Sequence, residues 1–461
     1  IRDSYNITGE AFLLDLGNLL HEQSFNFIDM FLNRDHLTRF NSIHCVNLAQ
    51  GLKEPVIYYQ QKPEKSYIDA VKKGLADIRK YNGQPQGMFG GDEGLHGNNP
   101  TQGSELCSAV ELMYSLEKMM EITGDLTFTD HLERIAFNAL PTQITDDFMN
   151  KQYFQQANQI MITRHPHNFY EDAHHAATDI IYGTRTGYPC CFSNMHQAWP
   201  KFTQSLWYAT PDKGIAALAY SPSEVVAQVG DGHEISIIED TYYPMDDKIR
   251  FTIRLSNSVK EVTFPFHLRI PEWCKGAAVT INGITDSING GSDMAILHRP
   301  WKDGDQVILS LPMKVESSRW YENSVAIERG PLVYALKMEE RWMKKEFVGK
   351  ERNQFGFDYY EVSSPTKWNY GILSATIEDL EKNSQVTIDP DKQSCDYFWN
   401  VRNAPIQIKL KAKEMTSWRI YNEMTGPLPF STSKSEQPEE EIVLVPYGCT
   451  TLRISEFPVV R

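Results

Sequence analysis

The sequence predicts a multidomain α plus β protein, in which a helical domain precedes one or more antiparallel β-sandwich domains. Apolar residues recur at three- and four-residue spacing through roughly the first 210 residues, as they do in amphipathic helices. After Pro211 the pattern changes to short runs rich in β-branched and aromatic residues, most of which alternate with a period of two. The chain has 461 residues, which is also too long for one ordinary core.

Six segments of the first part carry the helical pattern: 12–32, 44–52, 67–81, 104–122, 130–138 and 193–207. Turn residues such as Asn82-Gly83 and Gly90-Gly91 lie in the joints between them. We therefore expect a helical toroid over residues 1–211, of which these six helices would form about half.

The strand-rich remainder divides into two parts. Residues 212–340 are predicted to form a β-sandwich, with 225–229, 250–255 and 262–270 among its strands and Asn282-Gly283 as a hairpin signal. A polar stretch near 337–369 leads into a last strand-rich piece, 341–461, which includes strands at 406–410 and 442–445. Pattern alone leaves open whether this piece is an independent domain or closes the sandwich.

Composition narrows the classes of partner. The formal net charge of −15, without a Lys/Arg cluster to override it, argues against nucleic acid. No run approaches the roughly 18 apolar residues that span a bilayer. Seven cysteines at scattered spacings do not form a disulfide framework, so we interpret them as reduced thiols, some of them bound to a metal.

The residues with chemical content are two adjacent cysteines and an earlier Glu-x-Cys motif. Cys190 and Cys191 follow a proline, and two thiolates presented from one tight turn suit a shared metal better than a strained disulfide. Glu105 and Cys107 follow Ser104, a reasonable N-cap that would put both in the first turn of a helix. Three thiolates and a carboxylate would make a tetrahedral zinc site, although the residues alone also allow ordinary buried cysteines.

Four segments resemble the signature of glycoside hydrolase family 127, the β-L-arabinofuranosidases. They are Gly103-Ser-Glu-Leu-Cys107, Gly187-Tyr-Pro-Cys-Cys-Phe-Ser-Asn194, His44-Cys-Val-Asn-Leu-Ala-Gln50 and Ala326-Ile-Glu-Arg-Gly-Pro-Leu-Val-Tyr-Ala335. The resemblance runs from about residue 8 to the C-terminus. It implies an (α/α)6-barrel catalytic domain followed by β-sandwich domains, which agrees with the observed order of helical and strand patterns.

The resemblance also implies roles for particular residues. The implied zinc ligands are Glu105, Cys107, Cys190 and Cys191. Cys190 would also be the nucleophile, and Glu93 would be the general acid/base, with its neighbour Asp92 as the alternative acid. A retaining glycosidase needs such a pair on opposite sides of the anomeric carbon. Zinc would keep the cysteine sulfur deprotonated and would stabilise it as the leaving group of the second step.

Further candidates for binding the substrate are His44, His174, His175 and Tyr188. His44 resembles a family histidine of the sugar subsite, although a lone histidine is as often structural. His174 and His175 lie in a polar stretch before the cysteine pair, and Tyr188 flanks that pair. We expect the substrate to be an oligosaccharide or glycoside.

Some properties of the whole protein stay open. The spacing from Glu93 to Glu105 departs from the best-known arabinofuranosidases, so another pectin sugar such as aceric acid is an alternative substrate. A non-catalytic carbohydrate-binding module with structural zinc is the alternative of another class. Six helices are about half of an (α/α)6 barrel, so we expect its front half to lie outside this chain. The largely bacterial family points to the periplasm or cytoplasm, and the oligomeric state is not indicated.

Overall fold

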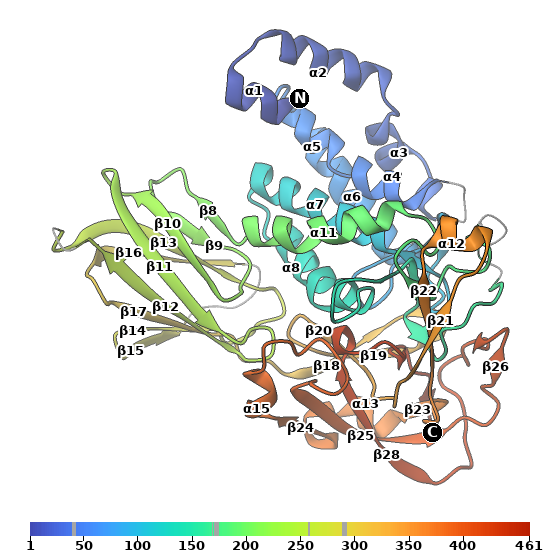
Figure 1. Ribbon diagram of the computed structural model, residues 1–461. Coiled ribbons are helices and arrows are strands. Elements are labelled where there is room, and N and C mark those ends of the chain that lie inside the picture. The colour runs from blue at the N-terminus through green and yellow to red at the C-terminus, as the bar shows by residue number, and fades with distance from the viewer. Residues whose placement is uncertain (39–42, 168, 170–174, 257–258, 288–292) are drawn as a thin grey trace.

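Helices dominate the chain up to Gln204 in the computed structural model, which describes residues 1–38, 43–167, 169, 175–256, 259–287 and 293–461 (Figure 1). The α-helices are α1 (Arg2–Thr8), α2 (Phe12–Gln23), α3 (Phe27–Asn33), α4 (Cys45–Gly51), α5 (Glu54–Tyr59), α6 (Lys65–Asn82), α7 (Leu106–Thr123), α8 (Thr127–Arg134), α9 (Leu140–Thr142) and α11 (Cys190–Gln204). A 3-10 turn (His36–Thr38) and a π-helical turn (Ile135–Ala139) join them. Within the described ranges, none of the helices has both the length and the apolarity needed to cross a membrane.

The central helix of this part is α7, which packs against α4, α8 and α11. Most of its residues are buried, because apolar and small side chains occupy nearly every side of it. It ends at Gly124, whose φ of 70° is the left-handed conformation that glycine adopts without strain, and Gly124 N–H donates to the Met120 carbonyl at 2.7 Å. The helix therefore has a fixed end, and its beginning faces the site described below.

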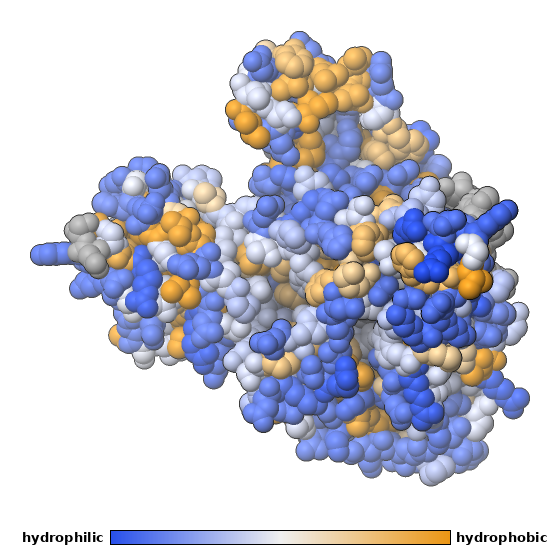
Figure 2. Space-filling view, viewed as in Figure 1, coloured by the Kyte–Doolittle hydropathy of each residue, from blue (hydrophilic) through white to orange (hydrophobic). Residues whose placement is uncertain are grey.

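The first helical segment predicted from the sequence, 12–32, is two helices. Asn26 ends the continuity because its side chain accepts a hydrogen bond from Asp29 N–H at 2.9 Å and so caps α3. No residue of α2 is buried, and its apolar residues Leu16, Leu19 and Leu20 stay exposed. Figure 2 shows a hydrophobic surface over α1 and α2. The short helix α5 has no counterpart in the predicted set.

The next part is a sandwich of two sheets. Its strands are β8 (Trp207–Ala209), β9 (Ile215–Ala217), β10 (Ser223–Val229), β11 (His233–Thr241), β12 (Lys248–Leu255), β13 (Val262–Ile270), β14 (Ala278–Ile281), β15 (Ile284–Ser287), β16 (Asp293–Trp301) and β17 (Gln306–Ser310). One sheet has the order β10-β11-β12-β17-β14-β15 and the other β16-β13-β9-β8. The Asn282-Gly283 hairpin signal is confirmed: both residues have positive φ and join β14 to β15.

A third sheet gathers strands from the last part of the chain in the order β18-β19-β20-β28-β25-β23-β30, with β24 paired to β25. Their bounds are β18 (Val315–Arg319), β19 (Val325–Arg329), β20 (Leu332–Leu336), β23 (Tyr370–Leu373), β24 (Ser384–Ile388), β25 (Ile406–Glu414), β28 (Glu439–Pro446) and β30 (Val459–Val460). Smaller elements around it are α13 (Ser374–Glu378), α14 (Leu380–Asn383), α15 (Pro390–Gln393), β26 (Ile420–Tyr421) and β27 (Met424–Thr425). The strands assigned by pattern to 212–340 therefore divide: those up to Ser310 lie in the sandwich, whereas β18 to β20 pair with the C-terminal strands.

Strand pairing ties the C-terminal part to the helical part. The polar stretch 337–369 forms a hairpin of β21 (Arg341–Glu346) and β22 (Asp358–Ser363), with α12 (Lys350–Phe355) at its tip beside the helical part (Figure 1). It extends a sheet that contains β7 (Tyr182–Gly183) and β4 (Lys151–Gln152), and β29 (Arg453–Ile454) pairs with β6 (Asn158–Gln159). A further small sheet, β2-β1-β3-β5, consists of Gly94–Gly97, Gly90–Asp92, Ser104–Glu105 and Phe154–Gln155. Its strand β3 leads directly into α7.

Candidate active site

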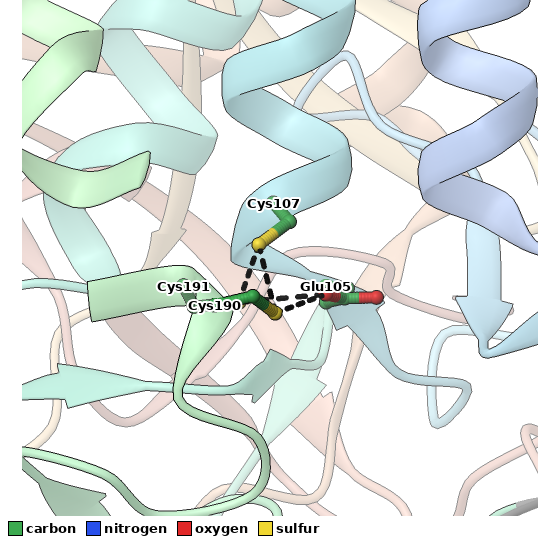
Figure 3. Close-up of side chains that lie close together, drawn as sticks. All are labelled: Glu105, Cys107, Cys190 and Cys191. Atoms are coloured by element: carbon green, nitrogen blue, oxygen red, sulfur yellow. Dashed lines mark hydrogen bonds between the residues drawn. The ribbon is translucent and has the colours of Figure 1, made fainter. Parts of the chain in front are cut away.

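Three thiols and one carboxylate meet where α7 and α11 begin (Figure 3). Glu105 ends β3, Cys107 is in the first turn of α7, and Cys190 and Cys191 open α11. Cys107 Sγ lies 3.0 Å from Cys191 Sγ and 3.3 Å from Cys190 Sγ, and Glu105 Oε1 lies 3.4 Å from Cys191 Sγ. One atom from each side chain lies within 4.8 Å of the others, so the four residues form a group that could hold a metal ion.

The local structure around this group differs from the sequence prediction in two ways. Ser104 is not an N-cap: it belongs to β3, and its hydroxyl donates to the Phe89 carbonyl at 2.7 Å, because β3 pairs with β1 and β5. Cys190 and Cys191 are consecutive helical residues and not part of a turn. Pro189 precedes them, and its fixed φ is compatible with the start of a helix.

The charges of this group favour a bound cation. Glu105 is 1% exposed, and its Oε2 has no hydrogen-bond partner among the described residues. Burial, with the nearby charges of Glu93 and Cys190, raises the pKa of Glu105 to about 8. Hydrogen bonds from the Cys107 and Cys191 thiols lower the pKa of Cys190 to about 3, while burial raises the pKa of Cys191. A divalent metal would neutralise this concentration of acidic groups, and sulfur with carboxylate oxygen fits zinc.

The group forms one wall of a cavity of about 910 Å³. Glu105, Cys107 and Cys190 face it, whereas Cys191 is fully buried. The rest of the wall combines residues of the helical part with two residues of α12: His44, Val46, Gln50, Glu93, Gly94, Tyr153, His175, Arg185, Gly187, Tyr188, Pro189, Asn194, Gln354 and Phe355. A cavity of this size is within the range that accommodates a small ligand.

Glu93 lies in this cavity at the turn between β1 and β2, with a φ of 74° that is unusual for a residue with a side chain. Its Oε2 is 3.1 Å from His44 Nε2, and its Oε1 accepts a short hydrogen bond from the Tyr153 hydroxyl. His175 Nε2 lies 4.0 Å from Oε1. Burial alone would raise the pKa of Glu93, but the hydrogen bonds from His44 and Tyr153 outweigh it and lower this pKa.

The other sequence candidates fall at different positions. Asp92 pairs with His96 across the same hairpin and is not among the residues that line the cavity. His175 is buried, with Nδ1 2.5 Å from Asp179 Oδ1, and Tyr188 is 57% exposed at the cavity wall. His174 lies outside the described residues.

Sequence reasoning missed several residues of this cavity. Tyr153, which touches Glu93, stands in a run of buried polar residues on short strands that has no helical or long-strand signature. Gln354 and Phe355 come from the polar stretch near 337–369, in which no motif indicated a part of the site. Lys151 does not line the cavity; it is fully buried, and its Nζ donates to the carbonyls of Thr186 and, at 2.9 Å, Tyr188. It therefore fixes the loop that enters α11.

The fold and the site define a multidomain α plus β protein in which a helical domain presents a thiol–carboxylate cavity. Two family models match the chain: "Beta-L-arabinofuranosidase, GH127 catalytic domain" over residues 1–204 and "Beta-L-arabinofuranosidase, GH127 middle domain" over residues 214–313. The chain therefore belongs to glycoside hydrolase family 127 (GH127). The middle-domain match ends between β17 and β18, where the strands change sheets.

The individual relatives share little sequence identity with this chain. A non-reducing end β-L-arabinofuranosidase of Bifidobacterium longum is 26% identical over 249 residues, which cover 52% of this chain and 36% of that protein. The match thus spans little more than a third of the curated relative. A GH127 β-L-arabinofuranosidase from Geobacillus stearothermophilus T6 has a TM-score of 0.67 at 18% identity, covering 99% of this chain and 70% of that chain. Another solved structure, of a GH127 β-arabinofuranosidase, has a TM-score of 0.68 at 17% identity, covering 99% of this chain and 67% of that chain. These two likenesses concern the fold.

Proposed function

We propose that this chain is a retaining glycoside hydrolase that removes terminal β-L-arabinofuranose, or a related furanose, from plant cell-wall glycans. One observation carries the proposal: the Cys190 thiol and the Glu93 carboxylate line the same cavity. A nucleophile and an acid/base that share a pocket are what a retaining mechanism requires. Membership of GH127 supports the reaction class, and the curated relative, described as a β-L-arabinofuranosidase, supports the sugar.

We assign zinc to the group formed by Glu105, Cys107, Cys190 and Cys191. The donor set supports this choice, because thiolates with a carboxylate suit a tetrahedral zinc site. When bound, zinc would hold the thiols deprotonated at neutral pH and stabilise a departing thiolate.

In the proposed reaction Cys190 Sγ attacks the anomeric carbon, and Glu93 donates a proton to the departing oxygen. Water then attacks the anomeric carbon while Glu93 takes its proton, and the carbon–sulfur bond breaks so that the Cys190 thiolate departs. The hydrogen bonds from His44 and Tyr153 lower the pKa of Glu93 and so favour its carboxylate form, which is the form that acts as base in the second step. A sugar lying over Glu93 excludes water and raises its pKa, which favours the first step.

Three residues around these two are proposed to bind the sugar. Asp179 holds the ring of His175 through Nδ1, so the opposite nitrogen of His175 faces the cavity near Glu93. Tyr188 offers an exposed ring and hydroxyl, and His44 reaches the cavity through Nε2. The role of His174 in binding the sugar remains a prediction from the sequence.

We further propose that the helices over residues 1–211 are a portion of an (α/α)6 barrel.

An acidic pectin sugar such as aceric acid is a second candidate substrate, favoured by one observation. Arg185 is exposed and lines the cavity, so its guanidinium could pair with a substrate carboxylate. Replacing Arg185 with Met tests this candidate. Turnover of an acidic pectin fragment should fall at least tenfold, while turnover of a neutral arabinofuranoside should stay within about twofold.

The main test measures bound zinc and hydrolysis of p-nitrophenyl β-L-arabinofuranoside on the same preparations. We expect near-stoichiometric zinc and turnover in the unmodified chain and in a Cys395→Ser control. Glu93→Gln should keep its zinc, and both Glu93→Gln and Cys190→Ser should lose about a hundredfold or more of the turnover. Zinc without turnover on neutral or acidic pectin fragments would instead support a carbohydrate-binding module with structural zinc. Absence of zinc would refute the assigned metal site.

A further inference from the structure

A second cavity, of about 570 Å³, lies where the helical part, the β21–β22 hairpin and the C-terminal part meet. Its wall comes from segments far apart in the sequence: residues within 141–150, the hairpin, 399–402 and 448–451. None of its lining residues lines the cavity that contains Cys190. We propose that this second cavity is a binding site for a neutral stretch of glycan, separate from the site of hydrolysis and therefore beyond the proposed function.

Aromatic side chains form part of the wall of this cavity. Trp342 is 42% exposed, yet its ring is held by Tyr182 and Tyr360, with centroids 5.2 and 5.9 Å away, and its Nε1 donates to Glu340 Oε2 at 3.2 Å. Trp399 also lines the cavity, and its ring stacks on the buried Phe137. Rigid aromatic rings that stay partly open to solvent lose little entropy when a ligand covers them. The apolar faces of sugar rings match such surfaces.

The same cavity also has polar groups in its wall. Asp146, Asp147, Asn150, Asn400 and Arg402 line it and offer both donors and acceptors, as an array of sugar hydroxyls requires. Asn400 Nδ2 donates to Asp146 Oδ2 at 3.0 Å, so this part of the wall is pre-organised.

The charge of the wall favours neutral glycans over acidic ones. Two aspartates, Glu340 and a single arginine, Arg402, line the cavity, so the acidic groups outnumber the basic ones. An oligosaccharide that carries carboxylates would be repelled by this excess. A neutral segment, such as an arabinan, is therefore the ligand class that fits.

The hairpin connects this cavity to the one that contains Cys190. Its strands supply Trp342 and Tyr360 to the second cavity, and α12 at its tip supplies Gln354 and Phe355 to the first (Figure 1). Even if fully extended at about 3.3 Å per residue, the five steps from Phe355 to Tyr360 span at most roughly 17 Å. A polymer held at the second cavity would therefore be concentrated close to the first.

The test measures binding of neutral arabino-oligosaccharides by isothermal titration calorimetry, with oligogalacturonates as the acidic comparison. Trp342→Ala should weaken binding at least tenfold. The exposed Arg402→Ala should also weaken it, without disturbing aromatic packing. Tyr242→Ala is the matched control, because Tyr242 is 45% exposed in the middle sandwich and should leave binding unchanged. Melting curves verify that each variant is folded.

The outcomes separate this proposal from the hydrolase proposal. Neutral binding that depends on Trp342 and Arg402 supports the second site even if the chain proves inactive on every glycoside. In an active chain, Trp342→Ala should leave p-nitrophenyl glycoside turnover unchanged while slowing sugar release from polymeric arabinan severalfold. Neutral binding of equal strength in Trp342→Ala and Arg402→Ala, or tighter binding of oligogalacturonates that these two variants weaken, would overturn the second site and leave the hydrolase proposal intact.

Discussion

At the scale of single residues, the surroundings of Glu93 control its protonation. Its backbone has a φ of 74°, and its carbonyl accepts the Cys45 N–H at 2.7 Å, so the strained turn is held in place. That turn directs the carboxylate at His44 and Tyr153. Burial would raise the Glu93 pKa, but the hydrogen bonds from His44 and Tyr153 lower it. Replacing either residue should therefore change the pH dependence of the proposed reaction.

Replacing Tyr153 with Phe keeps the ring and removes one of these donors. The Glu93 carboxylate loses stabilisation, so its pKa rises and the residue stays protonated to higher pH. Because the first step needs Glu93 protonated, we expect the basic limb of the kcat/KM profile to move to higher pH, with a change in rate of about tenfold at most near neutrality. Tyr188→Phe alters the same cavity wall without a hydrogen bond to Glu93 and should leave that limb in place. A shift to lower pH in Tyr153→Phe would contradict the assignment.

At the scale of elements, the proposed metal site joins the first turns of α7 and α11. Both helices direct their positive N-terminal ends toward the sulfur atoms, which helps to stabilise thiolates there. Without a cation, Glu105 keeps a buried oxygen that has no partner among the described residues. The junction of the two helices should therefore depend on the metal.

Removal of zinc by a chelator is expected to lower the melting temperature by roughly 5 °C or more, because the ion binds only the folded chain. Cys107→Ser should melt at a similarly lowered temperature and respond little to the chelator. Cys395→Ser, a cysteine outside the group, should keep the full response. The measurement is differential scanning fluorimetry with and without phenanthroline. A chelator effect of equal size in Cys107→Ser would place the metal elsewhere.

Helix α12 depends on a different interaction. Arg164 and Glu351 form a bidentate ion pair, with Nη1 to Oε2 at 3.0 Å and Nη2 to Oε1 at 2.5 Å. The Arg164 backbone N–H also donates to Glu361 of β22 at 3.0 Å. These contacts hold Gln354 and Phe355 against the cavity that contains Cys190.

Glu351→Gln weakens the Arg164–Glu351 ion pair that holds α12. We expect KM for an oligosaccharide to rise severalfold while kcat stays within about twofold, because only the cavity wall loosens. The partly exposed pair should contribute less than about 1 kcal/mol to stability. Asp358→Asn, which removes the Lys344 ion pair from the same hairpin, should leave KM unchanged. A fall in kcat without a change in KM would argue against this positioning role.

The elements also show what could be predicted from the sequence. Periodicity predicted longer elements such as α6 and β12, which bury one face, and the Asn282-Gly283 signal correctly predicted a turn. The split of 12–32 depends on a single cap at Asn26, which a periodic pattern does not register. In the site, the cysteines and Glu93 stand in distinctive motifs. Tyr153 and Phe355 reach the cavity only through sheet pairing between distant segments, which local sequence does not encode.

At the scale of the whole molecule, buried carboxyls should make stability depend on pH. Glu117 in α7 and Glu456 near the C-terminus are 3% and 0% exposed, and burial raises the pKa of each from 4.5 to about 8. Between these two values the folded chain holds protons that the unfolded chain releases. The free energy of unfolding therefore falls as pH rises through this window, because the folded state binds more protons there.

We expect the melting temperature to decrease steadily from about pH 5 to about pH 8, with each such group contributing up to about 1.4 kcal/mol per pH unit. Glu456→Gln and Glu117→Gln should each flatten this dependence, because a neutral amide resembles the protonated carboxyl and does not titrate. The effect should be larger toward pH 8, where the wild-type carboxyls carry the greatest cost. Glu10→Gln, at an exposed position, should reproduce the unmodified slope. A melting temperature that rises over this range, or an unchanged slope in both buried variants, would contradict the prediction. It would mean that the two carboxyls are already ionised in the folded chain and are stabilised there by nearby charges or solvent.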